Sequence, residues 1–314
     1  MNTGEDKKIS DLAKMLWREF DIISPYLRDE TTIEIMLNPD GNIWVEQIGK
    51  PMFSIGEMSL YNAQSLFATI AHSMGKTIDN RHPCLEGTLL INDARFEGFY
   101  PPVSSAPTFA IRKKSKKIFT LDDFKLSENQ KNTLIEWVKT RKNILIIGGT
   151  SSGKTSFANA VIDLMALFTP DDRIVILETL DEIQCRVKNH SKLIETMEVT
   201  MNQLLRGVMR YRPDRIIVGE VVDAAALSML KAWNTGHDGG LCTIHADSAI
   251  DGFDRLYDLI EESGINMSER VYRLIGRAVD GVVFLKKTND GKVVEEMANV
   301  TEFNGSEFVL DYVN

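Results

Sequence analysis

The residues of this chain with the clearest chemical capability form a glycine-rich loop that follows a short apolar run. Residues 148–155 match the pattern G-x-x-x-x-G-K-[ST] in full, and the apolar residues 144–147 precede them. Glycines let successive backbone N–H groups turn inward around a phosphate chain, and a helix N-terminus behind such a loop favours negative charge. The candidate phosphate-binding residues are Gly148, Gly149, Thr150, Ser151, Ser152, Gly153, Lys154, Thr155 and Ser156.

Two side chains of this loop have chemical roles of their own. Lys154 is expected to reach the β- and γ-phosphates of a nucleoside triphosphate, and Thr155 to place its hydroxyl on Mg²⁺. Apolar residues recur at helical spacing after the loop, from Phe157 to Phe168, so the required order of strand, loop and helix is present. The motif predicts binding of a nucleoside triphosphate and leaves its use open.

Polar residues that end other apolar runs are the next candidates, because ligands of an open α/β sheet bind beyond the carboxyl ends of its strands. Glu178 and Glu220 each follow such a run, and so does His245. Phosphoryl transfer needs Mg²⁺, a group that orients the water and cations around the γ-phosphate. We interpret Glu220 as the Walker B acid, Glu178 as a residue that positions water or metal, and His245 as a γ-phosphate sensor. Glu182, one helical turn after Glu178, either assists it or pairs on the surface.

Strand and helix signals alternate through the second half of the chain. Ser127 and Gln130 form a capping-box signature for a helix before the loop. Strands that are apolar throughout indicate a mainly parallel sheet covered on both faces. The predicted elements are strands 144–147, 174–177 and 215–218, helices ending near 168 and spanning 197–209 and 223–233, and an antiparallel tail of 282–287, 292–297 and 308–312 with a turn at 289–291.

The first half of the chain predicts a smaller α+β domain. It contains amphipathic helices at 9–20 and 63–74, a hairpin of strands 33–37 and 43–46, and further strands within 89–112. Pro101, Pro102 and Pro107 are expected to bar this last segment from a regular central position in a sheet. The basic run 112–117 precedes a polar stretch and indicates a linker, with a nucleic-acid or lipid role for its lysines as the alternative. The predicted domains are 1–113 and 127–314, joined by a linker at 114–126.

Composition limits the classes of function. The net charge of −9 and the pI near 5.2 make the whole chain a poor electrostatic partner for nucleic acid, so no specific nucleic-acid recognition is expected. No apolar run is long enough for a membrane span, and the polar N-terminus does not resemble a signal peptide, which predicts a cytoplasmic protein. The three cysteines are far apart in sequence, which predicts reduced thiols.

Several strings carry a resemblance to a known family. Residues 212–220, 232–237 and 243–246 read RPDRIIVGE, AWNTGH and TIHA, and the front half adds residues 38–41, 95–96, 100–103 and 107–113. The chain thereby closely resembles the secretion-superfamily ATPases, specifically the TrbB-like conjugal-transfer ATPases of type IV secretion. The resemblance covers nearly the whole chain.

This resemblance implies a RecA-like domain, ATP and Mg²⁺ as cofactors, and a homohexameric ring. It places the ring at the cytoplasmic face of the inner membrane, as a peripheral partner of type IV secretion components, with ATP between the two domains. It places Glu178 in the "Asp box", Glu220 at the Walker B acid and His245 in the "His box", so that Thr155, Glu178 and Glu220 serve the metal. Arg95 and Arg112 match arginines that contact the phosphates. An arginine delivered to the γ-phosphate is worth ~10³ to 10⁵ in rate, so Arg112 is also a catalytic candidate.

The chain departs from the family pattern at two positions. Thr179 stands where the family has Asp, and Val222 where it has Arg. Because one positioned group contributes ~10² to 10³ in rate, a slow ATPase is consistent with these changes. The four-cysteine zinc module of the related pilus and type II secretion ATPases is absent, which favours the conjugation branch. The alternatives are a pilus-retraction or type II secretion motor and a nucleotide-dependent scaffold with little turnover.

Overall fold

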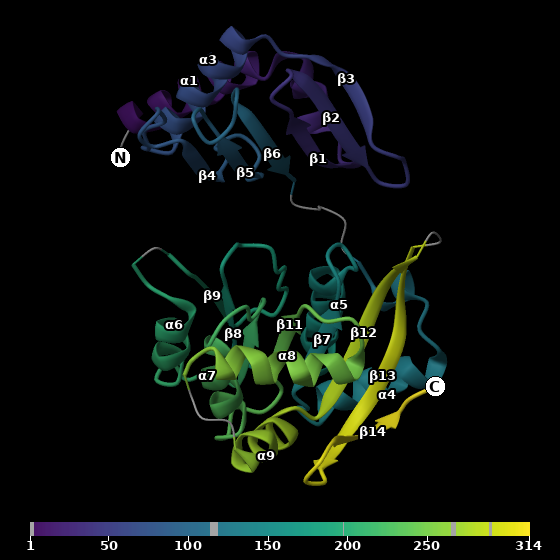
Figure 1. Cartoon of the computed structure of the whole chain (residues 1–314). Helices are drawn as coiled ribbons and strands as arrows, with labels where there is room; N and C mark the ends of the chain where they lie inside the picture. Colours follow the sequence, from purple (N-terminus) through teal and green to yellow (C-terminus); the bar gives the residue numbers. More distant parts are fainter. Residues whose placement is uncertain (1–2, 114–118, 197, 265–267, 289–290) are drawn as a thin grey trace. The chain divides into compact units, whose positions relative to one another are not determined.

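The computed structural model describes residues 3–113, 119–196, 198–264, 268–288 and 291–314. The chain divides into two compact units, Met1–Lys117 and Ile118–Asn314. Figure 1 shows that each unit is built around its own sheet. Most of the basic run, Met197 and the turn residues 289–290 lie outside the described residues.

The first unit is an antiparallel sheet in the order β3-β2-β1-β6-β5-β4, with helices packed on one face (Figure 1). The predicted hairpin is confirmed as β1 and β2. The elements are α1 (Thr3–Glu19), η1 (Asp21–Ile23), α2 (Ser24–Arg28), β1 (Thr32–Leu37), β2 (Asn42–Gln47), β3 (Phe53–Glu57), α3 (Leu60–Ser73), β4 (Cys84–Thr88), β5 (Arg95–Phe99) and β6 (Thr108–Arg112).

Alternation along the strands separates the two faces of this sheet. Ile35, Ile111 and Phe96 are opposed on neighbouring strands and fully buried beneath the helices. The prediction that prolines keep the segment 89–112 out of a central position was wrong, because β6 lies in the middle of the sheet, paired with both β1 and β5. Pro107 directly precedes β6, so it does not remove a hydrogen bond from the ladder.

The second unit contains a mixed sheet in the order β14-β13-β12-β7-β11-β10-β8-β9. The strands from β12 to β9 run parallel, while β13 and β14 add antiparallel pairs at one edge. The elements are η2 (Leu121–Phe124), α4 (Glu128–Lys139), β7 (Ile144–Gly148), α5 (Lys154–Phe168), β8 (Ile174–Glu178), β9 (His190–Ile194), α6 (Met201–Val208), β10 (Arg215–Val218), α7 (Ala225–Trp233), β11 (Leu241–Ile244), α8 (Ala249–Glu261), α9 (Glu269–Ala278), β12 (Gly281–Thr288), β13 (Gly291–Phe303) and β14 (Phe308–Tyr312).

Both faces of this second sheet are covered, which is why its central strands are buried at every position and mostly apolar. Leu145 and Ile147 of β7 pack into a core with α6, α7, α8 and α9. Ile144 and Ile146 of the same strand pack on the other side with α4, α5 and η2. The predicted fold class, an α/β domain with a mainly parallel sheet after a smaller α+β domain, is confirmed.

Residues at the start of the second unit pack into its core. Phe124 is fully buried, 5.0 Å from the ring of Phe157 on α5, and Thr120 forms a capping box with Asp123. The predicted linker, 114–126, includes Thr120, Asp123 and Phe124. The predicted capping box of α4 is present, since Ser127 Oγ accepts from the Gln130 N–H.

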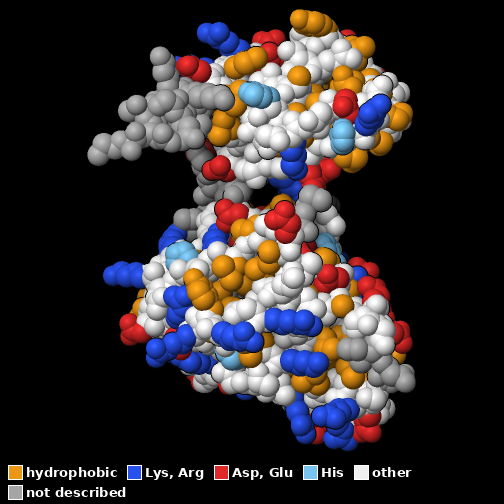
Figure 2. Space-filling view, turned by 90° about the vertical axis from the view of Figure 1, so that its left-hand side faces the viewer, with side chains coloured by type: hydrophobic (Ala, Val, Ile, Leu, Met, Phe, Trp, Pro, Cys, Tyr) orange, Lys and Arg blue, Asp and Glu red, His pale blue; other side chains and the backbone are white. Residues whose placement is uncertain are grey.

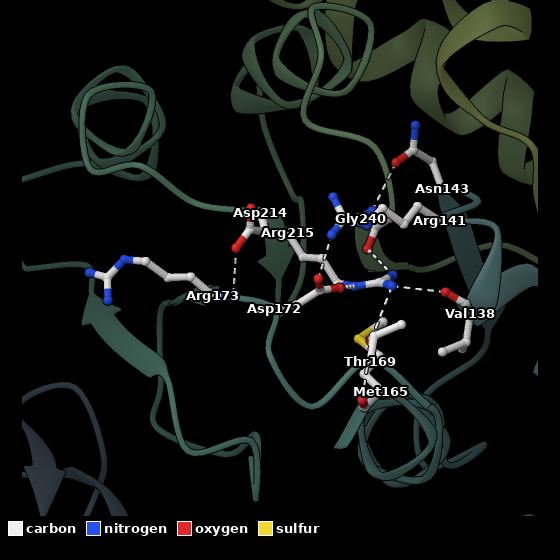
Figure 3. Close-up of polar contacts among 11 residues, drawn as sticks. Val138, Arg141, Asn143, Met165, Thr169, Asp172, Arg173, Asp214, Arg215 and Gly240 are labelled. Carbon is white, nitrogen blue, oxygen red and sulfur yellow. Dashed lines mark hydrogen bonds and ion pairs between the residues drawn. The ribbon is translucent and has the colours of Figure 1, made fainter. Parts of the chain in front are cut away.

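A buried arginine fixes the amino ends of the central strands. Arg215, at the start of β10, is fully buried. Its Nε donates to Asp172 Oδ2 at 2.6 Å, and its guanidinium also reaches Thr169 Oγ1 and the carbonyls of Val138 and Gly239 (Figure 3). These bonds tie β10 to the end of α4, to the segment between α5 and β8, and to the turn before β11. The network lies at the edge of the sheet opposite the glycine-rich loop.

The surface of the second unit is mixed in character. Figure 2 faces the side where α6 and β9 lie, and it shows Lys and Arg side chains spread among apolar ones. Local basic surface therefore coexists with the negative net charge of the chain. Within the described residues, no helix is both long enough and apolar enough to cross a membrane.

Candidate nucleotide-binding site

The glycine-rich loop leaves a buried strand and enters a helix, as its sequence predicts. Every residue of β7 is buried, and the strand ends at Gly148. A Cβ on Gly148 would lie 2.5 Å from Ser152 Oγ and 2.6 Å from the Leu285 carbonyl oxygen, so only glycine fits this turn. Gly153 has φ +101° and caps α5, the helix whose amino end points into the loop.

The side chain of Lys154 folds back over the loop. Its Nζ donates to the carbonyl oxygens of Gly148 at 2.9 Å and Gly149 at 3.3 Å. It also lies 3.1 Å from His245 Nδ1, and the lysine as a whole is only 8% exposed. The structure therefore brings together the predicted phosphate-binding lysine and the predicted γ-phosphate sensor.

Glu220 completes this row of side chains. Its Oε1 lies 3.0 Å from His245 Nε2, a distance that would form an ion pair if the imidazole were protonated. The two atoms are not aligned as a hydrogen bond, and Glu220 Oε1 has no hydrogen-bond partner among the described residues. Burial lowers the pKa of His245, and the nearby Lys154 ammonium lowers it further, while Glu220 opposes both. The imidazole is therefore disposed to be neutral at pH 7.

Glu178, the last residue of β8, is held in a defined position. It is 2% exposed, and its Oε1 accepts the backbone N–H groups of Glu182 at 3.0 Å and Ile183 at 2.7 Å. Its Oε2 has no hydrogen-bond partner among the described residues but lies 3.8 Å from Lys192 Nζ. Burial raises the pKa of Glu178, and the two N–H donors and Lys192 partly offset this. A Cβ on Gly219 would lie 3.0 Å from Glu178 Cγ, so glycine leaves room for this side chain.

Glu182 approaches the hydroxyl of the loop. Its Oε2 lies 3.4 Å from Thr155 Oγ1, a long hydrogen bond. The residues after Glu178 form no helix, so the sequence-based picture of one helical turn between Glu178 and Glu182 was wrong. Glu178 instead accepts the backbone N–H of Glu182, which turns the segment and points the Glu182 carboxylate toward the loop. The second sequence-based interpretation, pairing on the surface, does not describe this contact.

The oxygen donors at this edge suit a magnesium ion. Mg²⁺ prefers carboxylate and hydroxyl oxygens, keeps several waters, and takes only one or two protein ligands beside substrate phosphates. Thr155 Oγ1, together with carboxylate oxygens of Glu178 and Glu220 that have no hydrogen bond among the described residues, provides such donors. Within the described ranges no preformed cluster of three His, Cys, Asp or Glu exists. The donor set therefore fits a metal that arrives with a nucleotide.

The two predicted arginines lie in the first unit. Arg95 and Arg112 are directly opposed on β5 and β6, and both are exposed. Glu34 on β1 is opposed to Arg112, so the three residues form one polar row on the sheet face away from the helices. Burial raises the pKa of Glu34, while Arg112 lowers it. The action of these arginines on a nucleotide stays a prediction.

Two residues near the site were not predicted from the sequence. Lys192 on β9 donates to Asp181 Oδ1 and to the Ile183 carbonyl, and lies beside Glu178. Lys292 at the start of β13 donates to Ser156 Oγ at 3.1 Å. Both are single lysines on edge or tail strands without a recognisable motif, so only the three-dimensional arrangement identifies them.

Comparison with known proteins places the chain in a family. Residues 92–301 match the family described as "Type II/IV secretion system protein". The conjugal transfer protein TrbB of Rhizobium radiobacter is 40% identical over 290 residues, covering 91% of this chain and 89% of that protein. The type IV secretion system protein VirB11 of Bartonella henselae is 28% identical, covering 84% of this chain and 86% of that protein.

A solved structure shares the fold. The pilus retraction motor PilT with bound ADP matches with a TM-score of 0.63 at 20% sequence identity, covering 93% of this chain and 81% of that one. The family match spans most of the second unit, and the relatives extend it through the first. The resemblance predicted from the sequence is confirmed, and this chain belongs to the type II/IV secretion system protein family, with TrbB among its relatives.

Proposed function

We propose that this chain is an ATP-hydrolysing motor that powers conjugative transfer through a type IV secretion machine. The observation that carries the proposal is the continuous row from Lys154 through His245 to Glu220 at the carboxyl edge of a parallel sheet. The relative named as a conjugal transfer protein covers almost the whole chain, which supports the conjugation branch. The glycine-rich loop before α5 supplies the nucleotide site.

Each side chain at this edge has a distinct part in hydrolysis. Lys154, now bonded to loop carbonyls and beside His245, exchanges these contacts for phosphate oxygens. Glu178 is fixed by two backbone N–H groups, and Glu220 has an oxygen without a hydrogen bond in the described part of the chain. These two carboxylates orient and deprotonate the attacking water. His245 lies between Lys154 and Glu220 with a neutral imidazole. It can therefore form a hydrogen bond to the γ-phosphate without bringing a further positive charge.

Thr155, Glu178 and Glu220 are the residues that would hold Mg²⁺. Bound there, the ion would neutralise charge that develops on the phosphates. Arg95 and Arg112, adjacent on one sheet face of the first unit, would contribute further positive charge to the phosphates. We further propose that copies of this chain form a homohexameric ring in the cytoplasm, associated peripherally with the inner membrane and its secretion components.

The two departures from the family pattern, Thr179 and Val222, are expected to slow ATP hydrolysis and to leave nucleotide binding in place. Thr179 and Val222 are both exposed, and neither contacts the row of Lys154, His245 and Glu220 by any hydrogen bond among the described residues. A missing positioned charge at either place would slow hydrolysis by ~10² to 10³ without removing the nucleotide site.

Conjugal transfer from a donor strain that lacks the gene for this chain tests the proposal. The wild-type gene should restore transfer, while Lys154→Ala and Glu220→Gln should not. Glu198→Gln, the same charge change at an exposed position in the second unit, serves as the control and should restore transfer. Restoration by Glu220→Gln at the wild-type frequency would mean that hydrolysis is dispensable, and the chain would then be a nucleotide-dependent scaffold.

A further inference from the structure

Lys292, on the antiparallel strand β13, extends its side chain to the glycine-rich loop and the start of α5. Its Nζ donates to Ser156 Oγ at 3.1 Å and lies 4.3 Å from the centre of the Phe119 ring. The aliphatic part of Lys292 lies across Gly153, where a Cβ would come within 2.5 Å of Lys292 Cδ. Glycine at this position therefore serves both its left-handed backbone, φ +101°, and the passage of this lysine.

The fold explains why a residue so distant in sequence reaches the loop. Strand β12 runs parallel to β7, with Leu285 opposite Gly148, so β12 continues past the end of β7 at the loop's edge of the sheet. Lys292 is the second residue of the returning strand β13 and lies opposite Lys287 of β12. Phe119, the first described residue of the second unit, packs against Phe124 and so holds the ring beneath the Lys292 ammonium.

The electrostatics of this arrangement indicate an anion. The amino end of α5 carries partial positive charge, so a cation beside that end is disfavoured unless an anion is also present. Two ammonium groups reach the first turn of that helix, that of Lys154 at the Gly148 carbonyl and that of Lys292 at Ser156 Oγ, while the Glu182 carboxylate approaches the same turn at Thr155 Oγ1. A phosphate chain in the loop would lie within reach of both ammonium groups.

We propose that Lys292 binds the α-phosphate of the nucleotide and that Phe119 is a positioning residue for its ammonium. This inference rests on the proposed nucleotide site. Lys154 contacts Gly148, Gly149 and His245 at the sheet side of the loop, where the β- and γ-phosphates are expected. Lys292 contacts Ser156, one residue beyond the proposed metal ligand Thr155, and so lies at the other end of the phosphate chain.

Binding of ADP to Lys292→Met tests this proposal by calorimetry. Methionine keeps the aliphatic packing over Gly153 and removes the charge. Because a hydrogen bond to a charged group is worth ~1.5 to 3 kcal/mol, the Kd for ADP should rise about tenfold or more. Lys287→Met removes the same charge from the opposed, exposed residue on β12 and should leave the Kd unchanged.

Sulfur substitution on the nucleotide identifies the phosphate. At least one diastereomer of ADPαS should bind the wild type more weakly than ADP does, and Lys292→Met should erase that difference. The effect of sulfur at the β-phosphate should persist in the variant. Phe119→Leu should raise the Kd for ADP by a smaller factor and keep the α-sulfur effect, since the lysine remains.

Two results would overturn the proposal, and they are distinguishable. An unchanged Kd for ADP in Lys292→Met, or an α-sulfur effect that persists there, would show that Lys292 only packs on the loop, while the proposed function stands. Failure of the folded wild-type chain to bind ADP at all would overturn the proposed function and this inference together. Equal thermal unfolding of wild type and variant establishes that folding is not the cause.

Discussion

Replacement of Arg215 by methionine should destabilise the second unit strongly. The side chain is fully buried and donates to Asp172, Thr169 and the carbonyls of Val138 and Gly239. Methionine fills much of the volume but leaves those acceptors without their donor. Removing one partner of a buried ion pair costs ~3 to 5 kcal/mol. We expect a loss of about 3 to 4 kcal/mol, because Asp172 keeps a second bond, to Arg141.

Urea unfolding followed by tryptophan fluorescence measures this loss. Trp137 and Trp233 are buried in the second unit, while Trp17 and Trp44 lie in the first. Every protein compared therefore carries Trp17→Phe and Trp44→Phe, so that the fluorescence reports the second unit alone. Arg173→Met is the matched control, since Arg173 bonds at the surface to Asn189 and to the Tyr211 carbonyl, and it should change stability by less than about 1 kcal/mol. A loss below about 1 kcal/mol for Arg215→Met, or one equal to the control, would refute the argument.

Three further predictions concern the site. Burial raises the pKa of Glu178 in the folded state. Above the pKa of an unfolded glutamate, about 4.3, ionisation of this carboxyl therefore lowers the stability of the folded state. Glu178→Gln should therefore have a higher Tm than wild type at pH 8 and the same Tm near pH 4 in calorimetry, while losing ATP hydrolysis; an equal Tm at pH 8 would contradict the stated cause. Gly219→Ala should displace the Glu178 side chain and slow hydrolysis at least tenfold, with ADP binding retained by titration; wild-type turnover would exclude that contact as important. Lys154→Met should raise the pKa of His245 in an NMR titration, since the ammonium now lowers it; an unchanged or lower value would be inconsistent with the geometry.

Much of the fold follows from local patterns, because the central strands of the second unit contain continuous apolar runs. Strands β7, β8 and β10 are buried along their whole length, and a fully apolar run bounded by polar residues predicts such a strand. Strand β9 was not predicted, because it lies at the sheet edge and its sequence, His190–Ile194, is half polar. The central position of β6 was not predicted, because a strand's neighbours are set by pairing with segments distant in sequence. The presence of Pro107 before the strand carries no information on that pairing.

The site residues could be predicted from the sequence where the end of a strand determines their position. Glu178, Glu220 and His245 lie at or just after the carboxyl ends of neighbouring parallel strands, so the topology alone brings them to one edge. The contact of Glu182 with Thr155 depends on the irregular turn after β8, which has no periodicity to detect. Lys292 reaches the loop only because β12 pairs with β7 across more than a hundred residues of sequence.

Phosphate release at saturating MgATP tests the central claim most directly, measured for wild type and Glu220→Gln across a range of protein concentrations. Both proteins should bind ATP, since the glycine-rich loop is unchanged. Wild type should release phosphate at least about a hundredfold faster than the variant, because a positioned catalytic group contributes ~10² or more. A wild-type rate no higher than that of Glu220→Gln at every concentration would contradict the account and leave a nucleotide-binding scaffold.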